Sequence, residues 1–139
     1  MSVHHHGYMW VGSGSEYGQD SQRRPAGQGF AAIAVVPIEP ANWLLKSRSM
    51  VKATFKDIAP ALEWYHEQIL LYREAFDGDH AKADETIAAS LDSARETLEA
   101  GADVVGGWWG HRGTTFYAVH LVACPNPWRP TYACPEGLR

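Results

Sequence analysis

The most regular pattern in the chain is a pair of consecutive apolar stripes at helical spacing. The first stripe predicts a helix over residues 57–76, because its members recur every three or four residues: Ile58, Leu62, Tyr65, Ile69, Tyr72 and Phe76. A narrower stripe predicts a second helix over residues 79–100, and consists of Ile87, Leu91, Ala94 and Leu98. Only Asp77-Gly78-Asp79 separates the two, and so short a connection predicts an antiparallel helical hairpin.

Short runs of β-branched and aromatic residues on either side of this hairpin predict strands. Residues 104–109 and 115–123 flank a glycine-bounded turn, as in a β-hairpin. Residues 30–36 predict a central strand, and residues 51–55 a brief one. The order of elements predicts an α+β fold with a mostly antiparallel sheet of three to five strands, packed on one side by the two-helix hairpin.

The two ends of the chain differ in composition from its centre. Residues 1–29 hold six of the 13 glycines and predict an irregular arm, in which Tyr8 to Val11 form a short strand or an anchor. The run His4-His5-His6 carries no interpretable signal. Residues 125–139 contain four prolines and predict an extended tail. A length of 139 residues fits one domain, with its α+β core in residues 30–124.

Charge and hydropathy exclude several classes of partner. The chain has 12 basic and 16 acidic residues, and this net charge of -4 disfavours general binding to nucleic acid. No apolar run approaches the roughly 20 residues of a membrane span, and no signal-peptide pattern is seen. We therefore expect no membrane association and a location in the cytoplasm or within a larger assembly.

The strand predicted over residues 115–123 is apolar on both faces, whereas two helices can cover only one face of a sheet. Either the ends of the chain or another chain must cover the second face. The sequence also holds six tryptophans and six tyrosines, residue types that are enriched at protein interfaces.

We therefore expect a non-catalytic protein–protein interaction or assembly module that self-associates or binds a protein partner. A virion or complex component, an immunity-type protein and a regulatory binder all fit this class. Docking would use the arm and an aromatic sheet face, through Tyr8, Trp10, Trp108, Trp109, Phe116 and Trp128.

The alternative is a small enzyme with a histidine-containing pocket near the turn at residues 110–113. Its candidate residues are His111, Arg112, His120 and Tyr117, because imidazole, guanidinium and phenol groups serve in acid–base and electrostatic catalysis. The sequence contains no complete catalytic motif, so it favours the non-catalytic class.

Cysteine and histidine also raise the question of a metal site. His111, His120, Cys124 and Cys134 are of the right types for zinc, but their spacing matches no standard zinc finger. We therefore expect no metal and no cofactor. Cys124 and Cys134 enclose nine residues, and either a disulfide or a reduced pair is compatible with that spacing. The lack of a signal-peptide pattern favours the reduced pair.

Overall fold

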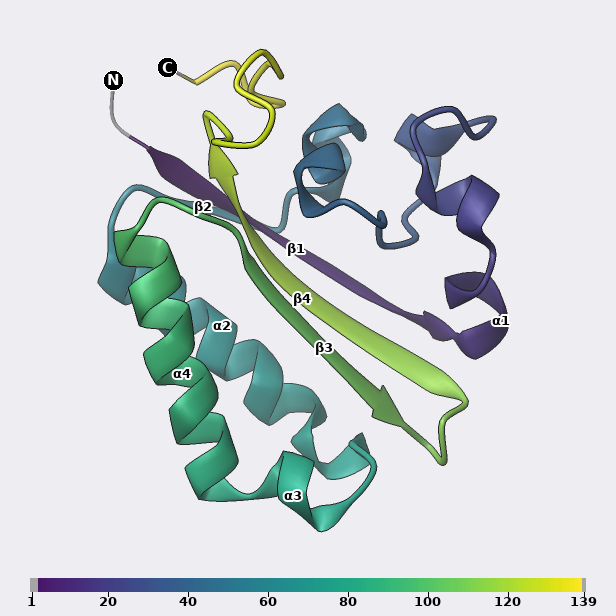
Figure 1. Ribbon diagram of the computed structural model, residues 1–139, viewed down its shortest axis with the longest axis vertical. Coiled ribbons are helices and arrows are strands. Elements are labelled where there is room, and N and C mark those ends of the chain that lie inside the picture. Colours follow the sequence, from purple (N-terminus) through teal and green to yellow (C-terminus); the bar gives the residue numbers. More distant parts are fainter. Residues whose placement is uncertain (1–2, 139) are drawn as a thin grey trace.

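The computed structural model describes residues 3–138 and contains a four-stranded antiparallel sheet (Figure 1). The strand order is β2-β1-β4-β3. The strands are β1 (His4–Ser13), β2 (Ala53–Phe55), β3 (Val104–Gly110) and β4 (Thr115–Cys124). The predicted α+β class is confirmed, and the number of strands falls within the expected range.

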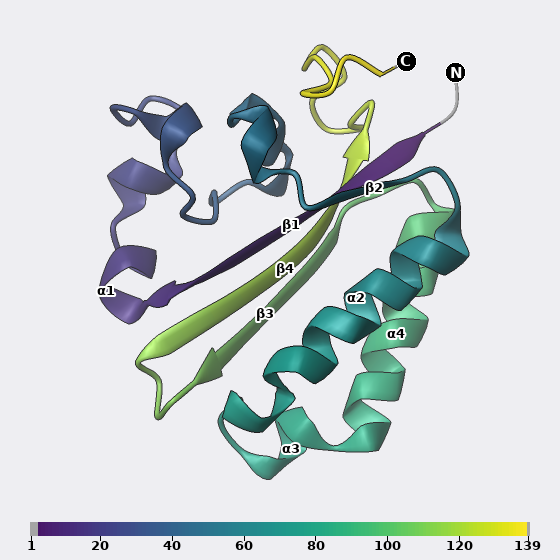
Figure 2. The ribbon, with the colours of Figure 1, turned by 180° about the vertical axis from the view of Figure 1, so that it is seen from behind.

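A helical hairpin covers one face of this sheet, as Figures 1 and 2 show from opposite sides. It consists of α2 (Ile58–Tyr72) and α4 (Asp84–Glu99), with the short α3 (Asp79–Lys82) in the connection between them. Ala83, with its extended backbone, separates α3 from α4, so the predicted second helix is interrupted near its start. The apolar stripes pack against alternate residues of β4, and Ile69, Leu98, Tyr117 and Leu121 are all buried in this core.

The long central strand β1 lies in the segment predicted to be an irregular arm. It pairs with β4 over ten residues, from His4 opposite Cys124 to Ser13 opposite Thr115. The arm prediction is therefore wrong for residues 4–13, although Tyr8 to Val11 do form part of a strand. Residues 1 and 2 of the predicted arm lie outside the described part. Glycine-rich composition misled the prediction, because a strand between two neighbours is held by long-range pairing and not by local propensity.

Residues 14–52 cover the second face of the sheet (Figure 2). This segment begins with the short α1 (Gly14–Tyr17) and continues through 3-10 turns, among them Pro40–Leu45. The strand predicted over residues 30–36 is absent from it: Phe30–Ala32 is a 3-10 turn, and Val35 and Val36 are buried without strand pairing. This run is apolar because it packs against the sheet. A buried strand would have the same apolar pattern, so the sequence alone could not tell the two apart.

The second face is therefore covered by the chain itself. Its central contact is a stack of Trp43 on Tyr8, with ring centroids 4.6 Å apart. Of the two coverings considered above, the structure shows self-coverage, mainly by residues 30–51, with Tyr132 and Cys134 of the tail also packed against this face. The observation that favoured docking through this face is removed.

Residues 125–138 are irregular, but turns at 129–132 and 134–137 fold them back, so they do not form the extended tail that the prolines predict. Arg129 donates two hydrogen bonds to the carboxylate of Glu39, at 2.6 and 2.7 Å, and the Tyr132 hydroxyl donates to Asn42 at 2.9 Å. These contacts hold the tail against residues 39–42. None of the helices within residues 3–138 combines the length and the apolar character needed to cross a membrane.

Candidate metal centre

Four potential metal ligands meet where β1 begins and β4 ends. His4 and His6 are two residues apart in β1, so their side chains share one face of the sheet. Cys124 is paired directly with His4 and therefore projects to the same face. Cys134 reaches the group from the tail, and the four donor atoms lie within 4.8 Å of one another.

The measured separations match those around a single tetrahedral ion. His4 Nε2 is 3.2 Å from His6 Nε2, and Cys134 Sγ is 3.6 Å and 3.4 Å from the same two nitrogens. Zinc bonds of about 2.1 Å to nitrogen and about 2.3 Å to sulfur imply N–N and N–S edges of roughly 3.4 and 3.6 Å in a tetrahedron. These three donors are thus already spaced to bind one ion, and the Cys124 thiol lies within 4.8 Å of each of them.

His6 is oriented for this role by contacts on its other ring nitrogen. Its Nδ1 lies 2.9 Å from the Thr54 hydroxyl oxygen and 3.2 Å from a carboxylate oxygen of Glu136. The Thr54 hydroxyl also donates to that carboxylate. A metal-bound histidine commonly donates its second N–H to a carboxylate, which fixes the ring and the tautomer. Here that arrangement directs the Nε2 lone pair toward the other ligands.

Burial sets the protonation of the ligands. It lowers the pKa of His6 to about 4, with a further lowering from His4, and it also lowers the pKa of His4. Both imidazoles are therefore neutral near pH 7, as a metal requires. Burial raises the pKa of the Cys124 thiol to about 12, so this thiol keeps its proton until a cation displaces it.

A small cavity connects the cluster to the surface. Its volume is about 270 Å³, and it lies between the end of β4 and the tail, with His4, Cys124 and Cys134 in its wall. Pro130 and Tyr132 also line it. The cavity gives an ion a route to the ligands.

The sequence analysis predicted only two of these four ligands. Of the four residues considered for zinc, Cys124 and Cys134 come together, and both are free thiols. The histidines that join them are His4 and His6, which the sequence analysis set aside. The available signal was the His-x-His spacing, which places both rings on one face if the segment is a strand.

The residues of the enzyme hypothesis are not brought to one place. His111 and Arg112 are exposed in the β3–β4 turn, with φ values of 49° and 58°. Tyr117 is buried on the helix-covered face. His120 points to the opposite face, where the Trp43 indole N–H donates to its Nδ1 at 3.0 Å. The ring centroids of His111 and Tyr117 are 6.4 Å apart, but His120 cannot join them.

The residues of the docking hypothesis are also dispersed. Tyr8 and Trp10 are buried beneath residues 30–51, and Trp108 stacks on Phe76 in the helix-covered core. Phe116 is half-buried against Tyr17. Only Trp109 and Trp128 have substantial exposure, at 39% and 75%. The six residues therefore do not form a continuous aromatic surface.

In comparisons with protein-family models, curated proteins and solved structures, nothing matches this chain.

Proposed function

We propose that this is a zinc-binding protein whose single Cys2His2 centre joins β1, the end of β4 and the tail. The observation that carries the proposal is the convergence of four nitrogen and sulfur donors within 4.8 Å, from three separate segments. Two imidazoles and two thiolates in a tetrahedron suit Zn²⁺, whereas Mg²⁺ and Ca²⁺ prefer oxygen ligands. The separation of the donors fits one ion and leaves no room for a multi-iron cluster among them.

The ligand set supports a structural role for the metal. Catalytic zinc centres usually have three protein ligands and an open position for water or substrate, whereas four protein ligands complete the tetrahedron. The ion would fasten Cys134 of the tail to the sheet and so close the loop that begins at Cys124. Because the unfolded chain lacks the preformed site, metal binding would add to the free energy of unfolding.

A non-catalytic interaction or assembly module remains our proposal for what the folded domain does. Trp128 favours it, because this largely exposed tryptophan lies on the loop that the metal would close between Cys124 and Cys134. A rigid loop that presents an aromatic side chain loses little entropy on binding. The enzyme alternative has less support, because His111 and His120 are far apart and face different surroundings.

The test measures metal binding by the full chain, purified without a polyhistidine tag. We expect one zinc per chain by elemental analysis, and the absorption of tetrahedral thiolate-bound Co²⁺ when cobalt replaces zinc. The variants Cys134→Ser and His6→Ala should weaken zinc binding by more than about tenfold. His111→Ala is the matched control, since this histidine is exposed and outside the cluster. A zinc content far below one per chain, or equal binding by His6→Ala and His111→Ala, would contradict the proposal.

A further inference from the structure

The two edges of the sheet differ in how they are protected from further strand pairing. The β2 edge is only three residues long, and Lys52, Lys56 and Asp57 flank it. Strand β3 is seven residues long, reads Val-Val-Gly-Gly-Trp-Trp-Gly, and has neither charge nor proline. Residues 75–77 pair with its last two residues, so its free edge is the part before Trp109. Natural sheets usually protect an edge with charged residues or proline, because an open edge pairs readily with another strand.

The direction of the free backbone groups of β3 follows from its hydrogen bonds. The carbonyl of Trp109 accepts from the Asp77 N–H at 2.9 Å, so the backbone groups of residue 109 point away from β4. Because this direction alternates along a strand, those of Val105 and Gly107 also point outward. Within residues 3–138 no hydrogen bond occupies these outward N–H and C=O groups. They can pair with a strand that lies alongside.

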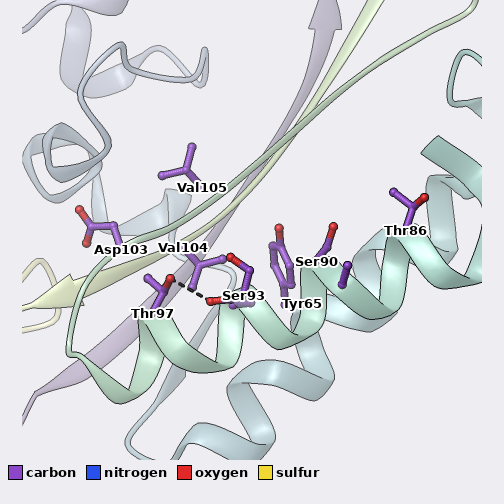
Figure 3. Close-up of a pocket in the computed structure, with 10 residues that line it drawn as sticks. Tyr65, Thr86, Ser90, Ser93, Thr97, Asp103, Val104 and Val105 are labelled. Atoms are coloured by element: carbon purple, nitrogen blue, oxygen red, sulfur yellow. Dashed lines mark hydrogen bonds between the residues drawn. The ribbon is translucent and has the colours of Figure 1, made fainter. Parts of the chain in front are cut away.

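A groove runs next to this edge. It has a volume of about 560 Å³ and lies between β3 and α4, as Figure 3 shows. The helix lines it with Ser90, Ser93 and Thr97, whose side chains are on the side of α4 that faces β3. These side chains are short, so an extended chain could approach the strand without displacing bulky groups.

The helix beside the groove carries most of the local charge. Between Asp84 and Glu99, α4 has five carboxylates and one arginine. At 100° per residue, Glu85, Asp92 and Glu96 fall together on one flank of the row that lines the groove. All three are exposed. These three side chains do not line the groove itself; they form an acidic rim on its solvent side, which matches a positively charged ligand.

We propose that the β3 edge and the α4 groove bind an extended, basic segment of a partner protein as an additional strand. The backbone of the segment would pair with Val105 and Gly107. Its basic side chains would project on the helix side toward the acidic rim, and the alternate side chains would lie beside Val105 and Trp109, which are 57% and 39% exposed.

Charge also argues against a second copy of this chain as the occupant. Two β3 edges paired about a two-fold axis would place both α4 helices on the same face of the joined sheet, with their acidic flanks close together. Like charges in such an arrangement oppose association. The proposal is independent of the metal centre, because Cys124 and its neighbours lie on the opposite face of the sheet.

The test uses a fluorescein-labelled peptide of alternating lysine and valine and measures fluorescence anisotropy with the full chain. A peptide of alternating glutamate and valine tests the charge, and a lysine–valine peptide with a central proline tests strand formation. Only the first should bind at concentrations up to about 1 mM, and its affinity should fall as salt is added.

Two variants locate the binding site. Val105→Pro removes an outward N–H without removing a hydrogen bond to β4, and it should lower affinity about threefold to tenfold, whereas Val105→Thr keeps the N–H and should not. The double variant Asp92→Lys, Glu96→Lys changes only exposed side chains and should lower affinity at least as much. It keeps the test valid if Val105→Pro fails to fold.

Three results would overturn the proposal. One is that the lysine and glutamate peptides bind with equal affinity, or that neither binds. Another is unchanged affinity for the lysine peptide in the double variant. The third is a wild-type dimer in sedimentation analysis that Val105→Pro converts to monomer, since this would assign the edge to a second copy.

Discussion

His120 should make the stability of this protein depend on pH between about 6.5 and 4. The side chain is buried, and its Nδ1 accepts a hydrogen bond from the Trp43 indole at 3.0 Å. A proton on Nδ1 would replace this acceptor with a donor that faces another donor. Burial, with a smaller contribution from the positive charge of Arg23, lowers the pKa of His120 from 6.5 to about 4.

The sign of the effect follows from which state binds the proton. Between pH 6.5 and 4 the unfolded chain protonates this histidine and the folded chain does not, so unfolding takes up a proton and the free energy of unfolding falls as pH falls. The contribution is complete above pH 6.5 and is lost progressively down to about pH 4. A difference of about 2.5 pKa units corresponds to about 3 kcal/mol.

The variant His120→Gln isolates this contribution. Its amide oxygen can accept from the Trp43 indole, but it does not titrate. Urea unfolding followed by tryptophan fluorescence at several pH values should show a shallower loss of stability for the variant than for the wild type. Other titrating groups, including the candidate metal ligands, are common to both proteins and cancel in the comparison.

His111→Gln is the matched control, because His111 is exposed in the β3–β4 turn. Its stability should follow that of the wild type across the same pH range. If His120→Gln and the wild type lose stability in parallel from pH 6.5 to 4, the reasoning about burial and the Trp43 hydrogen bond is refuted.

Two further predictions concern stability at neutral pH. Tyr8→Phe should raise the free energy of unfolding by about 1–3 kcal/mol, because the buried Tyr8 hydroxyl has no hydrogen-bond partner within residues 3–138 and the stack on Trp43 is kept. A lower urea midpoint for this variant would show that the hydroxyl is satisfied. Asp77→Ala should cost about 1–2 kcal/mol, since the Asp77 carboxylate accepts from the N–H groups of Arg112 and Gly113 at 2.8 and 2.7 Å. Thermal unfolding of Asp77→Ala should show a lower midpoint than that of Asp79→Ala, an exposed-site control. Equal midpoints for the two variants would contradict this prediction.

Local patterns predicted the elements that local interactions determine. The helical stripes from Ile58 to Leu98 gave the hairpin, and the residues around the Gly110–Gly113 turn gave β3 and β4. Each of these elements buries a periodic face, and the period can be read within one window of sequence. The break at Ala83 was missed, because one extended residue hardly changes that period.

The remaining features depend on contacts between distant residues. β1 lies in the middle of the sheet because β4 pairs with it along its whole length, and nothing in His4-His5-His6 indicates this partner. Residues 30–36 have the composition of a strand but cover the sheet instead. In the candidate metal centre the histidines and cysteines lie far apart in the sequence, so spacing rules for zinc fingers do not apply.

The pairing of β1 with β4 has a consequence for how the molecule assembles. These strands form the middle of the sheet, yet about 100 residues of chain separate them. During synthesis β1 cannot pair with β4 until β4 has been made, whereas α2 and α4 can form before that. We therefore expect a slow closure step late in folding, in which β1 pairs with a strand made about 100 residues later.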